Sequence, residues 1–356
     1  MIKLTQAHII GAIIAYLLGI FIVPLVIYFS KKAGLVDVPN ERKIHHGPIS
    51  RLGGIAVWIS VMLTFLFLVL LSYYPKGVGL SGIIVGGSLM FLLGLVDDIF
   101  CLNAKFKLFI QIAIATMVIL LGVRIDELWV PWADSPLELG IWAYPVSLLW
   151  IVGISNATNF IDGIDGLAGS IVTIGCIAIG IVSFVVTPPS PISALVAFIL
   201  MGAMLAFLTF NYNPAKIFMG DSGALYAGFL LAALSITGIM KNSATPVMYL
   251  PFIILAVPIL DVAFSSIRRI MKGSSPFIAD SEHIHHKLLH HGCSQDKVVL
   301  ILSTFAFACA IISILIAGSF SKYYIYAVML VAVLLILNMV SKAIKKTDIN
   351  DDGHEK

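Results

Sequence analysis

Carboxylates occur in pairs or beside glycines at three places in this sequence. They are Asp97 and Asp98 in GLVDD, Asp162 and Asp165 in NATNFIDGIDG, and Asp221 in FMGDSG. Neighbouring carboxylates repel each other unless protons or a cation intervene, and Mg²⁺ is commonly held by one or two carboxylates together with water and substrate phosphate. The aspartates therefore predict a site for Mg²⁺, for which Mn²⁺ is a chemical substitute.

The segment NATNFIDGIDG adds two carboxamides to its carboxylates. Asn156, Asn159, Asp162 and Asp165 follow one another at intervals of three residues, so in a helix they would share one face. The alternative is a plain polar turn between helices. The other motifs have structural alternatives too, because an Asp-Asp pair can start a solvated loop and Asp221 can serve as a helix N-cap.

Cationic side chains suited to phosphate accompany these acids. Lys105 and Lys107 follow the GLVDD motif, and HIHHKLLHH contains five histidines, of which His283, His285 and His286 come first. Two of the five are spaced for zinc, but the HExxH pattern of zinc proteases is absent. Imidazoles that donate to phosphate oxygens fit the neighbouring acids better.

One further acid lies within an apolar run. Asp261 in PILD is at a depth where a charge needs a partner, and Arg268 or Arg269 follows about two helical turns later. We expect one of these arginines to pair with Asp261.

The elements that must position these residues are membrane helices. The chain is 60% hydrophobic and only 12% charged, which is far from the composition of soluble domains. A net charge of +3, dispersed along the chain, gives no reason to expect nucleic-acid binding. The apolar runs predict an all-α, polytopic integral membrane protein with about eleven transmembrane helices, at 8–30, 52–73, 80–96, 108–123, 140–156, 167–187, 191–210, 223–240, 247–267, 298–318 and 323–342.

The loops differ in charge. Most of the 22 Lys and Arg residues fall in the loops after the first, third, seventh and ninth predicted spans and in the tail. By the positive-inside tendency this side is cytoplasmic, which places the N-terminus outside and the C-terminus in the cytoplasm. The polar motifs fall on the same side. We therefore expect one transmembrane domain (1–342) with a cytoplasmic active site, followed by a charged cytoplasmic tail (343–356).

A cytoplasmic side that gathers carboxylates, lysines and histidines at the membrane suits phosphoryl transfer to or from a lipid. Such a reaction depends mostly on positioning and charge neutralisation. An ion-coupled transporter also carries membrane carboxylates, but transporter sites lie near the midplane and usually come with inverted repeats. An intramembrane aspartyl protease would need a second catalytic aspartate inside a nearby span. Neither alternative accounts for the histidine cluster.

Taken together, the motifs resemble the polyprenyl-phosphate N-acetylhexosamine-1-phosphate transferase family. The resemblance covers nearly the whole chain and rests on RLGG, GLVDD, NATNFIDGIDGLA, NPAKIFMGDSG, PILD and HIHHKLL in the family's order. HIHHKLL is similar to the branch that uses UDP-N-acetylglucosamine (UDP-GlcNAc). It differs from the HHHxE-type run of the phospho-MurNAc-pentapeptide transferases, which remain the alternative within the family.

The resemblance implies a reaction. The phosphate of undecaprenyl phosphate would attack the sugar-linked phosphorus of UDP-GlcNAc, giving undecaprenyl-diphospho-GlcNAc and UMP, with Mg²⁺ bridging the diphosphate. This would be the first membrane step of a surface polysaccharide pathway, of the wall teichoic acid or O-antigen type, in the plasma membrane of a bacterium. Small residues in LLGLV and AGFLLAAL leave open whether they pack helices within one chain or between the chains of a homodimer.

The resemblance also implies roles for the candidate residues. Asp221 would be the firmest metal ligand, with Asp97 and Asp98 as further metal ligands and catalytic residues at the reacting centre. Asp97 would position the nucleophile and metal, because an ionised lipid phosphate needs no base. Asp162 and Asp165 would be catalytic residues around the metal, next to Asn156 and Asn159 at the nucleotide sugar. The cationic candidates would bind phosphate: His283, His285, His286 and Arg268 at the diphosphate, and Lys105 and Lys107 at the lipid phosphate.

Overall fold

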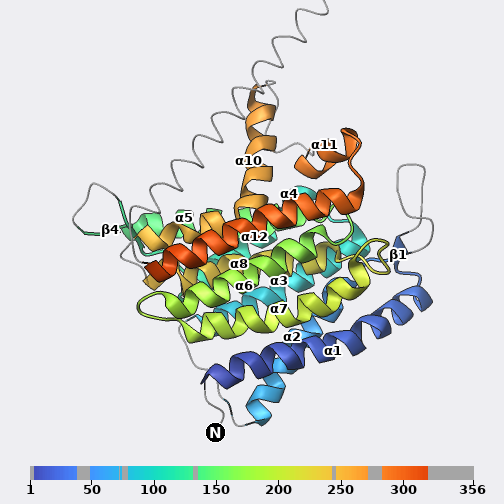
Figure 1. Ribbon diagram of the computed structural model, residues 1–356, viewed down its shortest axis with the longest axis horizontal. Helices are drawn as coiled ribbons and strands as arrows, with labels where there is room; N and C mark the ends of the chain where they lie inside the picture. Colours follow the sequence, from blue (N-terminus) through green and yellow to red (C-terminus); the bar gives the residue numbers. More distant parts are fainter. Residues whose placement is uncertain are drawn as a thin grey trace, which may run out of the picture.

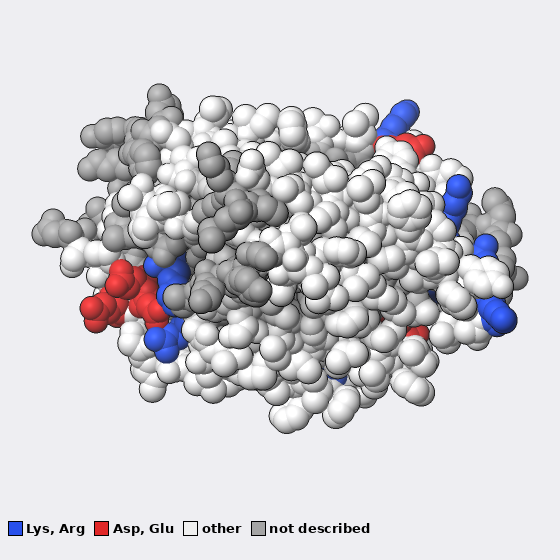
Figure 2. Space-filling view, turned by 90° about the horizontal axis from the view of Figure 1, so that it is seen from below, with Lys and Arg blue, Asp and Glu red and all other residues white. Residues whose placement is uncertain are grey.

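The computed structural model describes residues 4–37, 49–71, 73, 79–130, 135–242, 246–271 and 283–319. The predicted span 323–342 and the tail 343–356 lie outside the described residues. Long helices run side by side along the longest axis of the molecule (Figure 1). On the face seen in Figure 2, most charged side chains of the described residues lie towards the two ends of this axis, and the described residues between them are mostly uncharged. This distribution fits a body that crosses a membrane.

The long helices are α1 (Leu4–Lys32), α2 (Gly53–Leu70), α3 (Leu80–Phe100), α4 (Ala104–Leu120), α5 (Ala143–Phe160), α6 (Leu167–Val185), α7 (Pro191–Asn211), α8 (Gly220–Gly238), α10 (Ala256–Met271) and α12 (Gln295–Ser319). Shorter elements are α9 (Leu250–Ile254), α11 (Ile284–His290) and three 3₁₀ turns at Gly140–Trp142, Met240–Asn242 and Pro246–Tyr249. Two small antiparallel pairs complete the fold, β1 (Val36–Asp37) with β2 (Ile49–Ser50), and β3 (Glu127–Leu128) with β4 (Leu137–Glu138).

Among the described residues, seven helices are long and apolar enough to cross a membrane, or eight if one bent pair is a single span. The protein is therefore a polytopic, mostly helical membrane protein, as the sequence predicts. Each predicted span up to residue 318 contains a helix or a pair of helices. The prediction of eleven spans is finer than this finding and stays a prediction.

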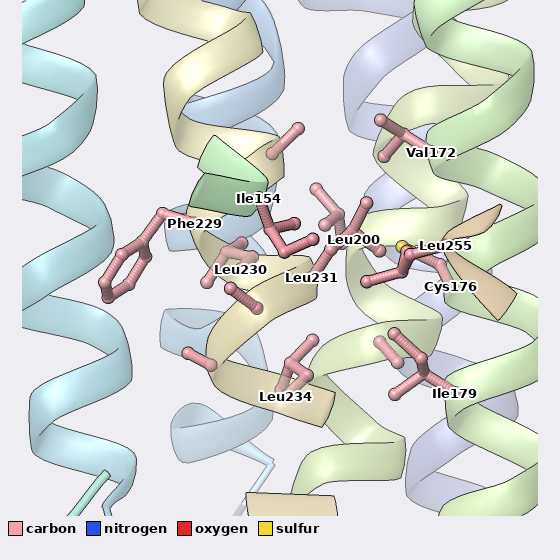
Figure 3. Close-up of a cluster of buried hydrophobic side chains, with 14 of the residues drawn as sticks. Ile154, Val172, Cys176, Ile179, Leu200, Phe229, Leu230, Leu231, Leu234 and Leu255 are labelled. Carbon is pink, nitrogen blue, oxygen red and sulfur yellow. The ribbon is translucent and has the colours of Figure 1, made fainter. Parts of the chain in front are cut away.

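The core is built around α8. Every residue of α8 from Ser222 to Gly238 is buried. Its apolar side chains meet those of α5, α6 and α7, as the close-up of Leu231, Cys176 and Leu200 shows (Figure 3). A helix that is apolar on all sides is stable only when it is surrounded. The first turn of α8 is thus held by a rigid body, which matters because that turn carries Asp221.

Two glycines let helices approach α8 closely. A Cβ atom at Gly228 would lie 2.8 Å from Thr158 Cβ on α5, and one at Gly94 on α3 would lie 2.4 Å from the carbonyl oxygen of Asp221. Both glycines belong to the small-residue segments singled out in the sequence. In this structure they pack helices within one chain, and the oligomeric state stays open.

The ninth predicted span is not one straight helix. The segments Val247–Ile254 and Ala256–Met271 are bent by 71° at Leu255. Pro258 explains the break, because it has no N–H to donate to the carbonyl of Ile254 and its ring clashes with that carbonyl. As a result α10 stands away from the direction of the other helices (Figure 1).

Candidate active site

Asp97 and Asp221 come from different helices and share one cation. The Nζ atom of Lys107, on the first turn of α4, lies 2.7 Å from Asp97 Oδ2 and also donates to Asp221 Oδ2. The side chains of Lys107 and Asp97 are each only 13% exposed. The three residues therefore form a partly buried ion-pair cluster where α3, α4 and α8 meet.

Asp98 has a different environment from its neighbour. Its Oδ1 accepts a hydrogen bond from the backbone N–H of Asp221 at 2.8 Å, and its Oδ2 accepts one from Ser222 at 3.0 Å. These N–H groups belong to the first turn of α8, where a helix has unsatisfied donors and a partial positive charge. Asp98 thus fixes the start of α8, and with it the position of Asp221, relative to α3.

The RLGG loop supports the same helix start from the other side. Gly53 and Gly54 donate backbone hydrogen bonds to Phe218 and Met219 at 3.0 and 2.9 Å, and Phe218 donates to Ser50 at 2.7 Å. A Cβ atom at Gly54 would lie 2.2 Å from Gly223 N, so this contact requires glycine. The adjacent glycines in RLGG are the sequence signal for it, although the contact itself was not predicted.

The NATNFIDGIDG segment is only partly helical. The helix α5 ends at Phe160 and α6 begins at Leu167, so Asn156 and Asn159 are helical but Asp162 and Asp165 lie in the turn between. The predicted single helical stripe is therefore wrong for the two aspartates. Gly166, directly before α6, has a φ of +78°, a left-handed conformation that glycine adopts without strain.

The turn is tied to the loop before α8. Asp165 Oδ2 accepts from the backbone N–H of Ala215 at 3.0 Å. Asn211 accepts from Gly166 N at 3.0 Å and donates to the carbonyl of Ile217 at 2.8 Å. Sequence reasoning missed Asn211, whose only signal was a carboxamide at the end of an apolar run.

Asp162 faces the same acidic cluster. Its burial, together with the charges of Asp221, Asp98 and Asp165, holds the pKa of Asp162 well above its usual range. The carboxylates from α3, α8 and the turn thus influence one another, which is the arrangement that a bound cation stabilises.

The donor set fits Mg²⁺. Asp97 and Asp221 already share one cationic group, and all their donor atoms are carboxylate oxygens, which hard divalent cations prefer. Within the described residues, no group of three or more His, Cys, Asp or Glu side chains converges as a closed metal site. A pair of carboxylates is what Mg²⁺ uses when water and substrate phosphate supply its other ligands.

The histidine segment is held by Asp261. Asp261 Oδ2 lies 2.7 Å from His283 Nδ1, and its Oδ1 accepts from the backbone N–H of Ile284 at 2.6 Å. We expected Arg268 or Arg269 as the partner of Asp261, and the carboxylate oxygens instead meet the start of α11. The bend before α10 brings this carboxylate to the histidines, and sequence spacing gave no sign of it.

His285 lies against the turn that carries Asp162. It is 1% exposed, neither ring nitrogen has a hydrogen-bond partner, and a Cβ atom at Gly163 would lie 2.3 Å from its Nε2. The pKa of His285 is lowered to about 4, mainly because the ring is buried, so the ring is neutral at pH 7. His285 is stacked on His283 at 5.8 Å and contacts His286 at 4.3 Å between ring centroids.

The structure does not bring all candidates together. The Lys105 side chain is exposed, and its backbone N–H donates to the side chain of the N-cap residue Asn103 at 2.9 Å. The side chain of Lys107 instead contacts the acidic cluster. Arg268 lies half-buried in the last turn of α10. Asn156 pairs with Gln111 of α4, a residue that sequence reasoning missed although it is a carboxamide in an apolar helix.

Known proteins resemble this chain over most of its length. The model of glycosyl transferase family 4 matches residues 80–239. A probable undecaprenyl-phosphate N-acetylglucosaminyl 1-phosphate transferase of Bacillus subtilis is 34% identical, covering 87% of this chain and 85% of the relative. A decaprenyl-phosphate N-acetylglucosaminephosphotransferase of Mycolicibacterium smegmatis is 33% identical over 82% of this chain and 77% of the relative.

A third relative comes from Escherichia coli. Its undecaprenyl-phosphate alpha-N-acetylglucosaminyl 1-phosphate transferase is 31% identical over 89% of this chain and 85% of the relative. The matched stretch of each relative includes the helices that meet at the acidic cluster. The chain therefore belongs to the polyprenyl-phosphate N-acetylhexosamine-1-phosphate transferase family.

Proposed function

We propose that this protein transfers GlcNAc-1-phosphate from UDP-GlcNAc to undecaprenyl phosphate, giving undecaprenyl-diphospho-GlcNAc and UMP. The observation that carries the proposal is the cluster of Asp97, Asp221 and Lys107 at the end of an apolar bundle. The turn that carries Asp162, whose pKa is raised in part by the charge of Asp221, packs against the ring of His285. The names of the relatives support GlcNAc-phosphate transfer to a polyprenyl phosphate.

The acidic and the basic side chains of the cluster would have different roles in the reaction. Asp97 and Asp221 would hold Mg²⁺, which supplies charge neutralisation for the diphosphate when it is bound. Lys107 lies close enough to the same carboxylates for its ammonium to meet a phosphate at the reacting centre. A lipid phosphate is already largely ionised near neutral pH, so Asp97 serves to position and not to remove a proton.

The neighbouring residues would complete the site. His285 is neutral near pH 7, so one ring nitrogen carries a proton that it can donate to a phosphate oxygen without adding charge. His283 and His286 flank it. Asn159, Asp162 and Asp165 would face the nucleotide sugar, and Arg268 and Lys105 would contribute positive charge at the rim.

We propose the following topology for the reaction. Residues 1–342 form one domain with eleven spans in a bacterial plasma membrane, the N-terminus lies outside, and the site and the tail 343–356 are cytoplasmic. Ser294 and Glu138 are exposed residues predicted on opposite sides. In a variant without native cysteines, Glu138→Cys should react with an impermeant thiol reagent on intact cells and Ser294→Cys should not. The reverse pattern would invert the topology.

The donor is tested by UMP release. Purified protein in detergent receives undecaprenyl phosphate, Mg²⁺ and either UDP-GlcNAc or UDP-MurNAc-pentapeptide. We expect UMP from UDP-GlcNAc alone, and loss of release with a chelator. Release from UDP-MurNAc-pentapeptide would move the protein to the peptidoglycan branch, and no release from either donor by folded protein would contradict the proposal. The product would enter a surface polysaccharide of the wall teichoic acid or O-antigen type.

A further inference from the structure

Gln111 is a polar residue that the roles described so far leave unexplained. It lies in the middle of α4 and is completely buried. A carboxamide in such surroundings costs free energy unless its hydrogen bonds are made. Its partner is Asn156 on α5: Asn156 Nδ2 donates to Gln111 Oε1 at 2.7 Å, and Gln111 Nε2 donates to Asn156 Oδ1 at 3.3 Å.

A third hydrogen bond fixes which way this amide pair points. Asn156 Nδ2 also donates to the carbonyl oxygen of Val152, one turn earlier on α5, at 2.8 Å. Turning the Asn156 amide over would place two oxygens against each other at that contact, so only one orientation is stable. Both N–H groups of Asn156 are then used inside the protein. Asn156 has no donor left for a substrate, unlike the role first expected for it.

Gln111 is linked to the acidic cluster through its own helix. Lys107 precedes it by four residues, so the two side chains lie on the same face of α4. Lys107 forms ion pairs with Asp97 on α3 and Asp221 on α8. Gln111 is hydrogen-bonded to Asn156 on α5. The opposite face of α4 is exposed at Phe109. Two polar anchors one turn apart therefore hold the inner face of this outlying helix.

We infer that Gln111 is a positioning residue for the phosphoryl-transfer site: by pairing with Asn156 it fixes α4 against α5, and so holds the Lys107 ammonium close to Asp97 and Asp221. The inference rests on the proposed function for its kinetic consequence, but the geometry of Lys107 can be measured without catalysis. Asn156 acts in the same way, as the other half of the pair.

The first test measures the reactivity of lysines by mass spectrometry after brief treatment of the full-length protein with an amine-acylating reagent. Lys107 is shielded and Lys105 on the same turn is exposed, so their labelling ratio is an internal measure of where Lys107 lies. In Gln111→Leu we expect the Lys107/Lys105 ratio to rise roughly two- to tenfold, the range expected for loss of one buried hydrogen bond.

A matched control comes from the same helix. Thr116 is exposed and bonds only the Ile112 carbonyl of its own helix, so Thr116→Val should leave the ratio unchanged. Gln111→Met, which is closer in shape, repeats the test if Gln111→Leu does not fold. An unchanged ratio in a folded Gln111 variant would overturn the inference. So would an equal rise in Thr116→Val, which would show general loosening of α4.

The second test is a double-mutant cycle on UMP release. If Gln111 acts through Lys107, adding Gln111→Leu to Lys107→Ala should lower kcat by no more than about twofold further. Losses that multiply would show independent action and contradict the inference. If the wild-type protein releases no UMP but the labelling ratio still shifts, the proposed reaction fails and the positioning role of Gln111 stands.

Discussion

The acidic cluster and the histidine segment are built differently. Asp97, Asp98 and Asp221 sit on helices packed through the core, and Asp98 bonds two backbone N–H groups of α8. The histidine segment is anchored by Asp261, which is carried by a helix that leaves the bundle at a 71° bend. A ring contact of His283 with Phe160 and apolar packing of α11 add to this anchor. A rigid frame suits charges whose spacing must not change, whereas a short segment anchored through a bent helix suits rings that adapt to a ligand.

Asp98→Asn tests the rigid frame and should have a larger effect than any substitution in the histidine segment. The amide keeps one acceptor oxygen, but its NH₂ group must face a backbone N–H of Asp221 or Ser222, which leaves a donor unsatisfied at a cost of about 1–3 kcal/mol. We expect a lower Tm and a fall in kcat of roughly 100-fold or more. Normal activity at unchanged Tm would show that Asp98 does not organise the start of α8.

Asp261→Asn tests the anchor of the histidine segment and should have a smaller effect. An amide still accepts from the N–H of Ile284 through one oxygen but holds His283 less firmly. We expect KM for UDP-GlcNAc to rise about tenfold with a smaller change in kcat, since a charge-assisted hydrogen bond is worth about 1.5–3 kcal/mol. If kcat fell as far as in Asp98→Asn, the two regions would not differ as described.

The buried ring of His285 makes stability depend on pH. Because its pKa in the folded protein is about 4, below that of an exposed histidine, the unfolded chain binds more protons between these values and stability is lost as the pH falls from 6.5 towards 4. His285→Gln should remove about 2–3 kcal/mol of this dependence. Parallel curves of Tm against pH for wild type and His285→Gln would contradict the assignment.

Lys105→Ala should have the smallest effect. The side chain is exposed at the rim, where a single charge contributes little. We expect KM for undecaprenyl phosphate to rise by no more than about threefold, and Lys107→Ala in the same assay to be far more severe. Equal effects of the two substitutions would mean that the ion-pair cluster does not mark the reacting centre.

Much of the fold was predictable because apolar runs of the right length become helices in a membrane. The bend at Leu255 was not predicted, since a proline in a span shows where a helix can break but not where the next helix points. Lys105 and Lys107 looked equivalent in sequence, and only the helical phase of α4 separates them. The pairing of Asp261 with His283, and of Gln111 with Asn156, joins residues far apart in the chain, which spacing alone cannot reveal.

The measurement that tests the central claim most directly is UMP release by Asp221→Asn compared with wild type, across a Mg²⁺ titration with UDP-GlcNAc and undecaprenyl phosphate. The asparagine keeps the shape of the side chain but removes the charge shared with Lys107. We predict a loss in kcat of roughly 1,000-fold that added Mg²⁺ does not restore. Near-normal turnover at every Mg²⁺ concentration would contradict the account of this cluster as the metal-dependent reacting centre.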